Sequence, residues 1–203
     1  MREDRIAKRR EEIINAALDL FAQKGYHETK ISDIAKRLNI AHGTCYLYYK
    51  SKFEIFSAVV EKIMNAIADL VLREAPQATN TLMEHRAQLE RIGNALIDFF
   101  LKDMRVAKIL FWALPGVDPG LDAKVTELLG RLDQYTEQYL LNGVEKGFLK
   151  KDLDTEVFAK AANGLILAGV RHLMASGDPR AYKEIYNDRW VNAILQIMLE
   201  GMA

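Results

Sequence analysis

The chain has 203 residues, of which 50% are hydrophobic and 28% charged, a composition typical of one or two folded globular domains. Its 28 basic residues balance 28 acidic residues, so the total charge by itself argues against a nucleic acid partner. A single cysteine excludes an internal disulfide, no apolar run reaches the roughly 18 residues of a membrane span, and the charged start lacks the apolar core of a signal peptide. We therefore expect a cytoplasmic protein.

Basic residues are concentrated at the N-terminus. Residues 1–52 contain 11 Lys and Arg against 7 Asp and Glu, a net charge of +4, so the remaining chain carries −4. Basic side chains in the first predicted helix would alone indicate only a solvated face, but beside the turn motif described next they favour a polyanion-binding surface: Arg2, Arg5, Lys8, Arg9 and Arg10. Apolar spacing predicts that this helix runs from about Arg5 to Lys24 and ends at Gly25.

Residues 29–56 contain two short helical patterns that meet at a tight turn. The first pattern has the three-and-four spacing of one buried helix face, at Ile31, Ile34, Ala35 and Leu38. We expect Thr29 to accept hydrogen bonds from the free amides that open this helix.

The second pattern is very short and begins with a small polar tip. Asn39 suits the turn because it tolerates unusual backbone angles, and we expect Ile40 to fill the angle between the two helices. His42, Gly43 and Thr44 then open the second helix. A tip of this kind fits a helix-turn-helix element, whose second helix reads base edges in the major groove.

The end of this element resembles a known family. Residues 43–49, GTCYLYY, and the Lys50-Ser51-Lys52 that follows them resemble the end of the DNA-binding domain in the tetracycline-repressor (TetR) family of bacterial regulators. Upstream residues are similar to the family's first two helices: Ile14, Ala17, Leu18, Phe21, Gly25 and residues 29–35. Cys45 and Phe53 depart from the family's usual residues, which concerns local packing more than function.

The resemblance implies DNA-contacting roles for nine residues. His42 and Thr44 are expected to contact base edges, and Gly43 to allow close approach of the backbone. The expected phosphate contacts are Thr29, Lys30, Tyr46, Tyr48, Lys50 and Lys52. Tyr49 and Cys45 are interpreted as core residues. A redox role for Cys45 is the less favoured alternative, because there is no second cysteine.

A long fourth helix is expected to connect two domains. An apolar stripe predicts a helix from about Lys52 to Glu74, with a length of about 30 Å at ~1.5 Å per residue: Phe56, Val60, Ile63, Ile67 and Leu70. Residues 74–81 form a polar break, in which Asn80 or Thr81 is expected to cap the next helix.

These elements predict an all-α fold without a sheet. A three-helix DNA-binding domain would occupy residues 1–52, with its helix-turn-helix at about 30–50. The connecting helix, 53–74, would join it to a helical ligand-binding and dimerisation bundle within 53–203.

Five further helices are predicted in the C-terminal region. They run over about 82–102, 104–114, 121–147, 155–176 and 180–201. Pro115-Gly116 and Pro119-Gly120 are expected to end the second of them, Gly147 to end the third, and Asp154 to cap the fourth. The third carries a heptad seam that is too short for a free coiled coil: Leu121, Val125, Leu128, Leu132, Tyr135 and Tyr139.

We expect a homodimer that binds a near-palindromic operator in double-stranded DNA, because two helix-turn-helix elements related by a two-fold axis combine their binding energies. The resemblance implies an interface made by the last two helices of each subunit. Candidate interface residues are Ala161, Gly164, Ala168, Trp190, Ile194 and Ile197, and ordinary packing within one chain is the alternative.

The resemblance also implies that a small-molecule effector binds in the C-terminal bundle. Candidate pocket residues are Phe99, Phe100, Met104, Phe111, Trp112, Tyr135, Tyr139, Asn163, Arg171 and Met174, each of which also suits an ordinary core. His172 is interpreted as structural. Polar groups on the otherwise apolar helix after Asp154 need partners, so we expect a largely apolar, elongated or aromatic effector with one polar or anionic end.

The predicted function is a DNA-binding transcriptional regulator, expected to be a repressor that its effector releases, with activation left open. No metal site, cofactor or catalytic residue is expected, since the four histidines are scattered and no phosphate-binding loop or nucleophile elbow occurs. The alternative is a helical scaffold protein without DNA binding, which would leave the basic N-terminus unexplained.

Overall fold

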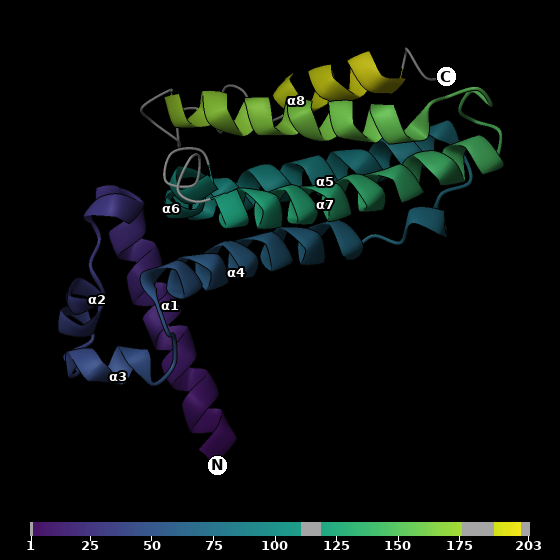
Figure 1. Cartoon of the computed structure of the whole chain (residues 1–203). Helices are drawn as coiled ribbons and strands as arrows, with labels where there is room; N and C mark the ends of the chain where they lie inside the picture. Colours follow the sequence, from purple (N-terminus) through teal and green to yellow (C-terminus); the bar gives the residue numbers. More distant parts are fainter. Residues whose placement is uncertain (1, 111–118, 176–188, 200–203) are drawn as a thin grey trace. The chain divides into compact units, whose positions relative to one another are not determined.

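The computed structural model describes residues 2–110, 119–175 and 189–199, and these residues are helical without a strand (Figure 1). The elements are α1 Arg2–Glu28, α2 Ile31–Arg37, α3 His42–Tyr46, α4 Lys52–Leu72, the 3-10 turn η1 Pro76–Ala78, α5 Leu82–Lys102, α6 Met104–Lys108, α7 Pro119–Glu145, α8 Thr155–Ala175 and a helix over 189–199. The predicted all-α fold is confirmed. Within the described ranges, no helix combines the length and apolarity needed to cross a membrane.

The chain divides into two compact units. The first comprises Met1–Asn65 with Arg105–Val125, and the second comprises Ala66–Met104 with Thr126–Ala203. Helix α4 passes without a break from the first unit into the second. The functional division into residues 1–52 and 53–203 stays a prediction.

The core of the first unit is built from one side of each of its helices. Phe21 of α1 and Phe56 of α4 are buried and meet edge to face, with ring centroids 4.9 Å apart. The predicted buried face of α2 is confirmed for Ile31, Ile34 and Ala35. These contacts fix α1, α2 and α4 against one another through apolar burial.

Helix α1 is interrupted where the sequence predicted its end. Gly25 has φ 79° and ψ 170°, a left-handed conformation that glycine adopts without strain. The ammonium of Lys52, the first residue of α4, donates to the carbonyl oxygens of Tyr26 at 2.8 Å and His27 at 3.2 Å. The same ammonium lies 4.3 Å from the centre of the Tyr26 ring. Lys52 therefore ties the start of α4 to the end of α1.

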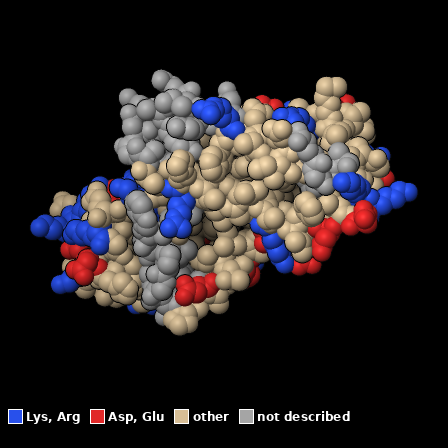
Figure 2. Space-filling model, turned by 90° about the horizontal axis from the view of Figure 1, so that it is seen from above, with Lys and Arg blue, Asp and Glu red and all other residues tan. Residues whose placement is uncertain are grey.

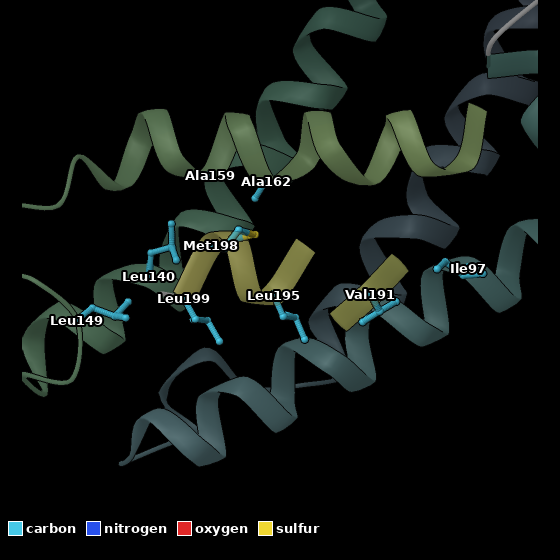
Figure 3. Packing of buried hydrophobic residues seen from close by; sticks show 9 residues of the cluster. All are labelled: Ile97, Leu140, Leu149, Ala159, Ala162, Val191, Leu195, Met198 and Leu199. Carbon is cyan, nitrogen blue, oxygen red and sulfur yellow. The ribbon is translucent and has the colours of Figure 1, made fainter. Parts of the chain in front are cut away.

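The core of the second unit joins α5, α7, α8 and the helix over 189–199. Its buried cluster comprises Ile97, Leu140, Leu149, Ala159, Ala162, Val191, Leu195, Met198 and Leu199 (Figure 3). Small residues on α8 allow this approach: a Cβ added to Gly169 would collide with the indole nitrogen of Trp190. Trp190 also stacks on His172, with ring centroids 5.8 Å apart.

Helix boundaries in this unit follow local capping. The Thr81 hydroxyl accepts from the Glu84 amide at 3.2 Å, and Asp154 accepts from the Val157 amide at 3.2 Å, so both predicted caps are confirmed. Gly147 has φ 78° just after the end of α7, as the sequence predicted. The expectation for Pro119-Gly120 was wrong: these residues open α7, because proline suits the first turn of a helix.

Helix α7 is joined to the end of α4 by Tyr139. Its buried hydroxyl lies 2.7 Å from the Val71 carbonyl oxygen and 2.6 Å from that of Glu74. Burial raises the pKa of Tyr139 to about 12, so the hydroxyl keeps the proton that it donates to these carbonyls.

His85 on α5 is fully buried. Its ring lies 5.3 Å from the ring of Phe148, and neither ring nitrogen has a hydrogen-bond partner among the described residues. Burial lowers the pKa of His85 from 6.5 to about 4. The folded protein therefore holds His85 in its neutral form.

We predict that His85 makes stability fall in acid. Because its folded pKa lies below its unfolded pKa, its contribution is fully present above pH 6.5 and is lost as the pH falls toward about 4, by up to about 3 kcal/mol. Urea unfolding at several pH values should show that His85→Leu lacks this part of the pH dependence of the free energy of unfolding. His27→Leu, at an exposed histidine, is the control and should keep it. Parallel pH profiles for wild type and His85→Leu would contradict the prediction.

Candidate DNA-binding surface and effector cavity

The turn between α2 and α3 is built by local backbone bonds. Asn39 adopts φ 52°, the left-handed conformation that asparagine tolerates, which confirms the predicted turn. The Ile40 amide then donates to the Ala35 carbonyl at 3.0 Å, and the Thr44 amide donates to that of Ala41 at 2.8 Å. These bonds end α2 and start α3 only a few residues later.

Helix α3 has one buried side and one exposed side. Cys45 and, just beyond the helix, Tyr49 are buried, as the sequence predicted. Burial raises the pKa of the Cys45 thiol and of the Tyr49 hydroxyl. The exposed side carries His42, Gly43 and Tyr46, and the rings of His42 and Tyr46 meet edge to face at 5.2 Å. Thr44 is half-buried between the two sides.

Leu47 is a candidate contact that the sequence reasoning missed. Its side chain is 80% exposed, at the end of α3 and one helical turn after Gly43. A signal was present in the sequence, since an apolar residue at this spacing follows a polar tip. An exposed apolar side chain beside base-reading residues suits contact with a thymine methyl group.

The expectation that Thr29 caps the start of α2 was wrong. Thr29 is completely buried, and its hydroxyl donates to the Gly25 carbonyl at 2.7 Å and lies 3.3 Å from that of Leu20. The residue that caps α2 is Lys30, whose amide donates to the Asp33 carboxylate at 3.2 Å. This bond lowers the pKa of Asp33. The Thr29 side chain therefore secures the α1 break, and its expected phosphate contact stays a prediction.

The basic candidates differ in how far they are already engaged. Lys30 and Lys50 have exposed side chains, whereas the half-buried Lys52 donates to the two α1 carbonyls. Burial lowers the pKa of Lys52. Tyr48 is half-buried, and its carbonyl accepts from Arg10 of α1 at 3.1 Å. The Arg10 guanidinium also lies 5.2 Å from the centre of the Tyr49 ring, so Arg10 positions the segment after α3.

Asp19 of α1 joins two further helices of the first unit. Its carboxylate forms ion pairs with Arg37 at the end of α2 and with Arg105 in α6. The helix-turn-helix and α6 thus share one anionic partner.

A cavity of about 80 Å³ lies within the second unit. Its described lining comprises Val71, Leu89, Ile92, Gly93, Leu96, Ile97, Thr136, Tyr139, Ala162, Asn163, Ile166, Trp190, Val191, Ile194, Leu195 and Met198. These residues come from the end of α4, from α5, α7 and α8, and from the helix over 189–199. The wall is largely apolar, as expected for a small-molecule site.

The structure brings two of the predicted pocket residues to this cavity, Tyr139 and Asn163. Phe100 is instead buried, Arg171 is exposed, and neither lines the cavity. The half-buried candidates Phe99, Met104, Tyr135 and Met174 are also absent from its described lining. Phe111 and Trp112 lie outside the described residues.

The candidate interface residues differ in exposure. Ala161, Gly164 and Ala168 of α8 are exposed at a spacing that places them on one face of the helix. Ile197 is 66% exposed, and Trp190 and Ile194 are half-buried.

The all-α fold, the left-handed turn and the exposed side of α3 define a helix-turn-helix DNA-binding protein. Residues 13–59 match the family model of bacterial regulatory proteins, tetR family. This match and the relatives described next support a TetR-family transcriptional regulator whose DNA-binding domain includes residues 13–59.

Individual relatives agree with this assignment. The chain is 24% identical over 155 residues to the fatty acid metabolism regulator protein of Bacillus subtilis. The match covers 76% of this chain and 78% of that protein. It is 39% identical over 64 residues to IcaR, a negative transcriptional regulator of Staphylococcus epidermidis. This match covers 32% of this chain and 35% of IcaR.

Solved structures share the fold. The transcriptional regulator FadR from Bacillus subtilis, solved in complex with stearoyl-CoA, matches with a TM-score of 0.76 and 23% identity over 95% of this chain and 99% of that chain. The fatty acid degradation regulator FadR from Bacillus halodurans matches with a TM-score of 0.79 and 24% identity over 94% of each chain.

We predict that Gly43→Val separates DNA binding from folding. A Cβ at Gly43 meets nothing within 4 Å, so the free energy of unfolding should change by less than about 1 kcal/mol. The added side chain would hold the backbone away from the groove and weaken operator binding by at least about tenfold. Gly130→Val, at another helical glycine with open space around it, should leave both quantities unchanged. Operator affinity equal to that of the wild type in Gly43→Val would contradict the assignment.

Proposed function

We propose that this regulator is a dimeric repressor that leaves a near-palindromic operator when an elongated, largely apolar effector of the acyl-chain class enters its second unit. The observation that carries the proposal is the apolar cavity, whose wall includes a residue of α4, the helix that also contributes to the core of the DNA-binding unit. A protein that binds bacterial DNA in this way works in the cytoplasm.

On the DNA side, we assign base contacts to the exposed His42 and to Thr44, with Gly43 allowing close approach. Phosphate contacts are assigned to Lys30, Tyr46, Tyr48 and Lys50, whose side chains are exposed or half-buried. Lys52 contributes mainly by fixing α4 to α1, since its ammonium already donates to two carbonyls.

The effector class is supported by the cavity and by one relative. The described wall is dominated by aliphatic side chains, which favour a hydrocarbon chain. FadR from Bacillus subtilis, which shares the fold, was solved in complex with stearoyl-CoA. An acyl chain in the cavity with its ionised headgroup in water satisfies both observations.

Release requires the effector to bind the DNA-incompetent arrangement more tightly than the competent one. Val71 offers a direct route, because its side chain lines the cavity while its carbonyl accepts from Tyr139. Further along the same helix, Ile55 and Phe56 are buried in the first unit. An effector that displaces Val71 therefore acts on the helix that supports the reader.

Dimerisation is supported by the exposed face of α8. Figure 2 views the chain from the side on which α8 lies in Figure 1, and it shows a broad area without charged side chains, bordered by both basic and acidic ones. Val157 of α8 is 56% exposed, and Ile197 of the helix over 189–199 is 66% exposed. A second copy that covers this face would remove its apolar surface from water.

We predict that stearoyl-CoA weakens operator binding. Anisotropy of a labelled operator selected from genomic DNA should show an affinity roughly five- to 150-fold lower with stearoyl-CoA, the range of a typical coupling energy of ~1 to 3 kcal/mol. CoA without an acyl chain is the ligand control and should have no effect. Ala162→Leu, which fills the cavity wall, should bind the operator normally and lose the response. Tighter operator binding with stearoyl-CoA would refute release as the mechanism.

We predict that Gly164→Arg dissociates the dimer. A Cβ at Gly164 meets nothing within 4 Å in one subunit, so the subunit should still fold, but two arginines would face each other across the two-fold axis. Sedimentation should show a dimer dissociation constant at least about tenfold higher, because like charges would be buried together. Gly130→Arg, at a glycine of α7 with equally open space, should remain dimeric. If both variants sediment like the wild type, α8 does not form the interface.

A further inference from the structure

The cavity wall has one polar site that the proposed function does not use. Among its described lining residues there is no Lys, Arg, His, Asp or Glu. The polar side chains are those of Thr136, Tyr139, Asn163 and Trp190. Tyr139 is committed to the carbonyls of Val71 and Glu74. The indole nitrogen of Trp190 lies against Gly169 and has no hydrogen-bond partner among the described residues. Thr136 and Asn163 remain as the hydrogen-bonded pair in the wall that can meet a ligand.

These two side chains form an ordered pair where α7 faces α8. The Thr136 hydroxyl donates to Asn163 Oδ1 at 3.1 Å, and Asn163 Nδ2 donates to the Asp133 carboxylate at 2.7 Å. An amide nitrogen carries two hydrogens, so Asn163 keeps one for a ligand. A hydroxyl oxygen has two lone pairs, so Thr136 can also accept. The pair therefore offers one donor and one acceptor, held in place from outside the cavity by Asp133.

The charge around this pair selects against an anion. The Asp133 carboxylate accepts from the Asn163 amide at 2.7 Å, and no described lining residue carries a positive charge. Burial of an ionised carboxylate without a cationic partner is strongly unfavourable. A hydroxyl or carbonyl oxygen meets no such cost and satisfies the free donor.

We propose that the buried part of the effector is neutral and carries one hydrogen-bonding oxygen. A hydroxyl would accept from Asn163 Nδ2 and donate to Thr136 Oγ1, whereas a carbonyl would accept from Asn163 Nδ2 alone. The proposal rests on the proposed function in taking this cavity as the effector site. It refines the expected effector, because any ionised end must stay outside the cavity. For an acyl thioester, the carbonyl is the group of this kind.

Three ring compounds of similar shape test the proposal on the free protein without DNA. Toluene is apolar, phenol carries a neutral hydroxyl, and benzoate is anionic at neutral pH. Methyl NMR titrations that follow Ile92 and Ile194, both in the cavity wall, would localise binding and give dissociation constants. We expect toluene and phenol to bind, and benzoate to bind at least about tenfold more weakly than phenol.

Matched variants then isolate the polar pair. Asn163→Leu should weaken phenol binding by about tenfold, the effect of one lost hydrogen bond, while toluene binds as tightly as before or more tightly. Thr136→Val is a smaller change that should also weaken phenol binding. If Asn163→Leu fails to fold, Thr136→Val alone tests whether the polar pair binds the phenol hydroxyl. Toluene binding shows in each variant that the cavity persists.

The outcomes separate this inference from the proposed function. Benzoate binding as tightly as phenol, unchanged phenol binding in both variants, or no binding of any probe would overturn the inference. Failure of stearoyl-CoA to release the operator would count against the proposed function alone, because the ring compounds are measured without DNA.

Discussion

The DNA-reading surface of the helix-turn-helix depends on burial of one side of α3, a helix that is too short to be stable alone. Helix α3 has five residues, and isolated helices of that length do not persist in water. Cys45 and Tyr49 fix it because their side chains are buried in the first unit. Arg10 adds a bond to the Tyr48 carbonyl just after the helix. The exposed tip is therefore rigid because the opposite side is buried, which is the condition for reading a groove.

The second unit meets a different constraint, since it must be stable and also hold a cavity. Its buried cluster joins four helices, and Tyr139 ties the end of α4 to α7. Apart from the Trp190 indole nitrogen, the polar side chains of the cavity wall have hydrogen-bond partners, as in the chain from Thr136 through Asn163 to Asp133. A bundle organised in this way keeps a site for a ligand without leaving a buried charge unpaired.

Much of the fold could be predicted from the sequence because local signals decided it. Helix α5 has the predicted bounds, since Thr81 caps its start, and Asn39 and Gly147 adopt the left-handed conformations that their residue types favour. Thr29 could not be placed, because a threonine before a helix usually caps it, and only the α1 break brings the Gly25 carbonyl within its reach. Pro119 reads equally well as the end of one helix or the start of another.

The cavity was less predictable than the reader. Helical spacing shows which residues face inward. Phe100 is an inward side chain that fills space, whereas Ile92, about two turns earlier on α5, lines a hollow. That difference depends on how several helices meet, which a single sequence does not encode locally. Leu47 was overlooked for the opposite reason, since apolar residues are generally assigned to cores.

The division of labour within α3 has an evolutionary consequence. Its outward side chains contribute little to the core, so selection can exchange them without repacking the protein. A duplicated copy of such a regulator would drift toward a new target sequence by a few substitutions at these positions while its fold stayed intact.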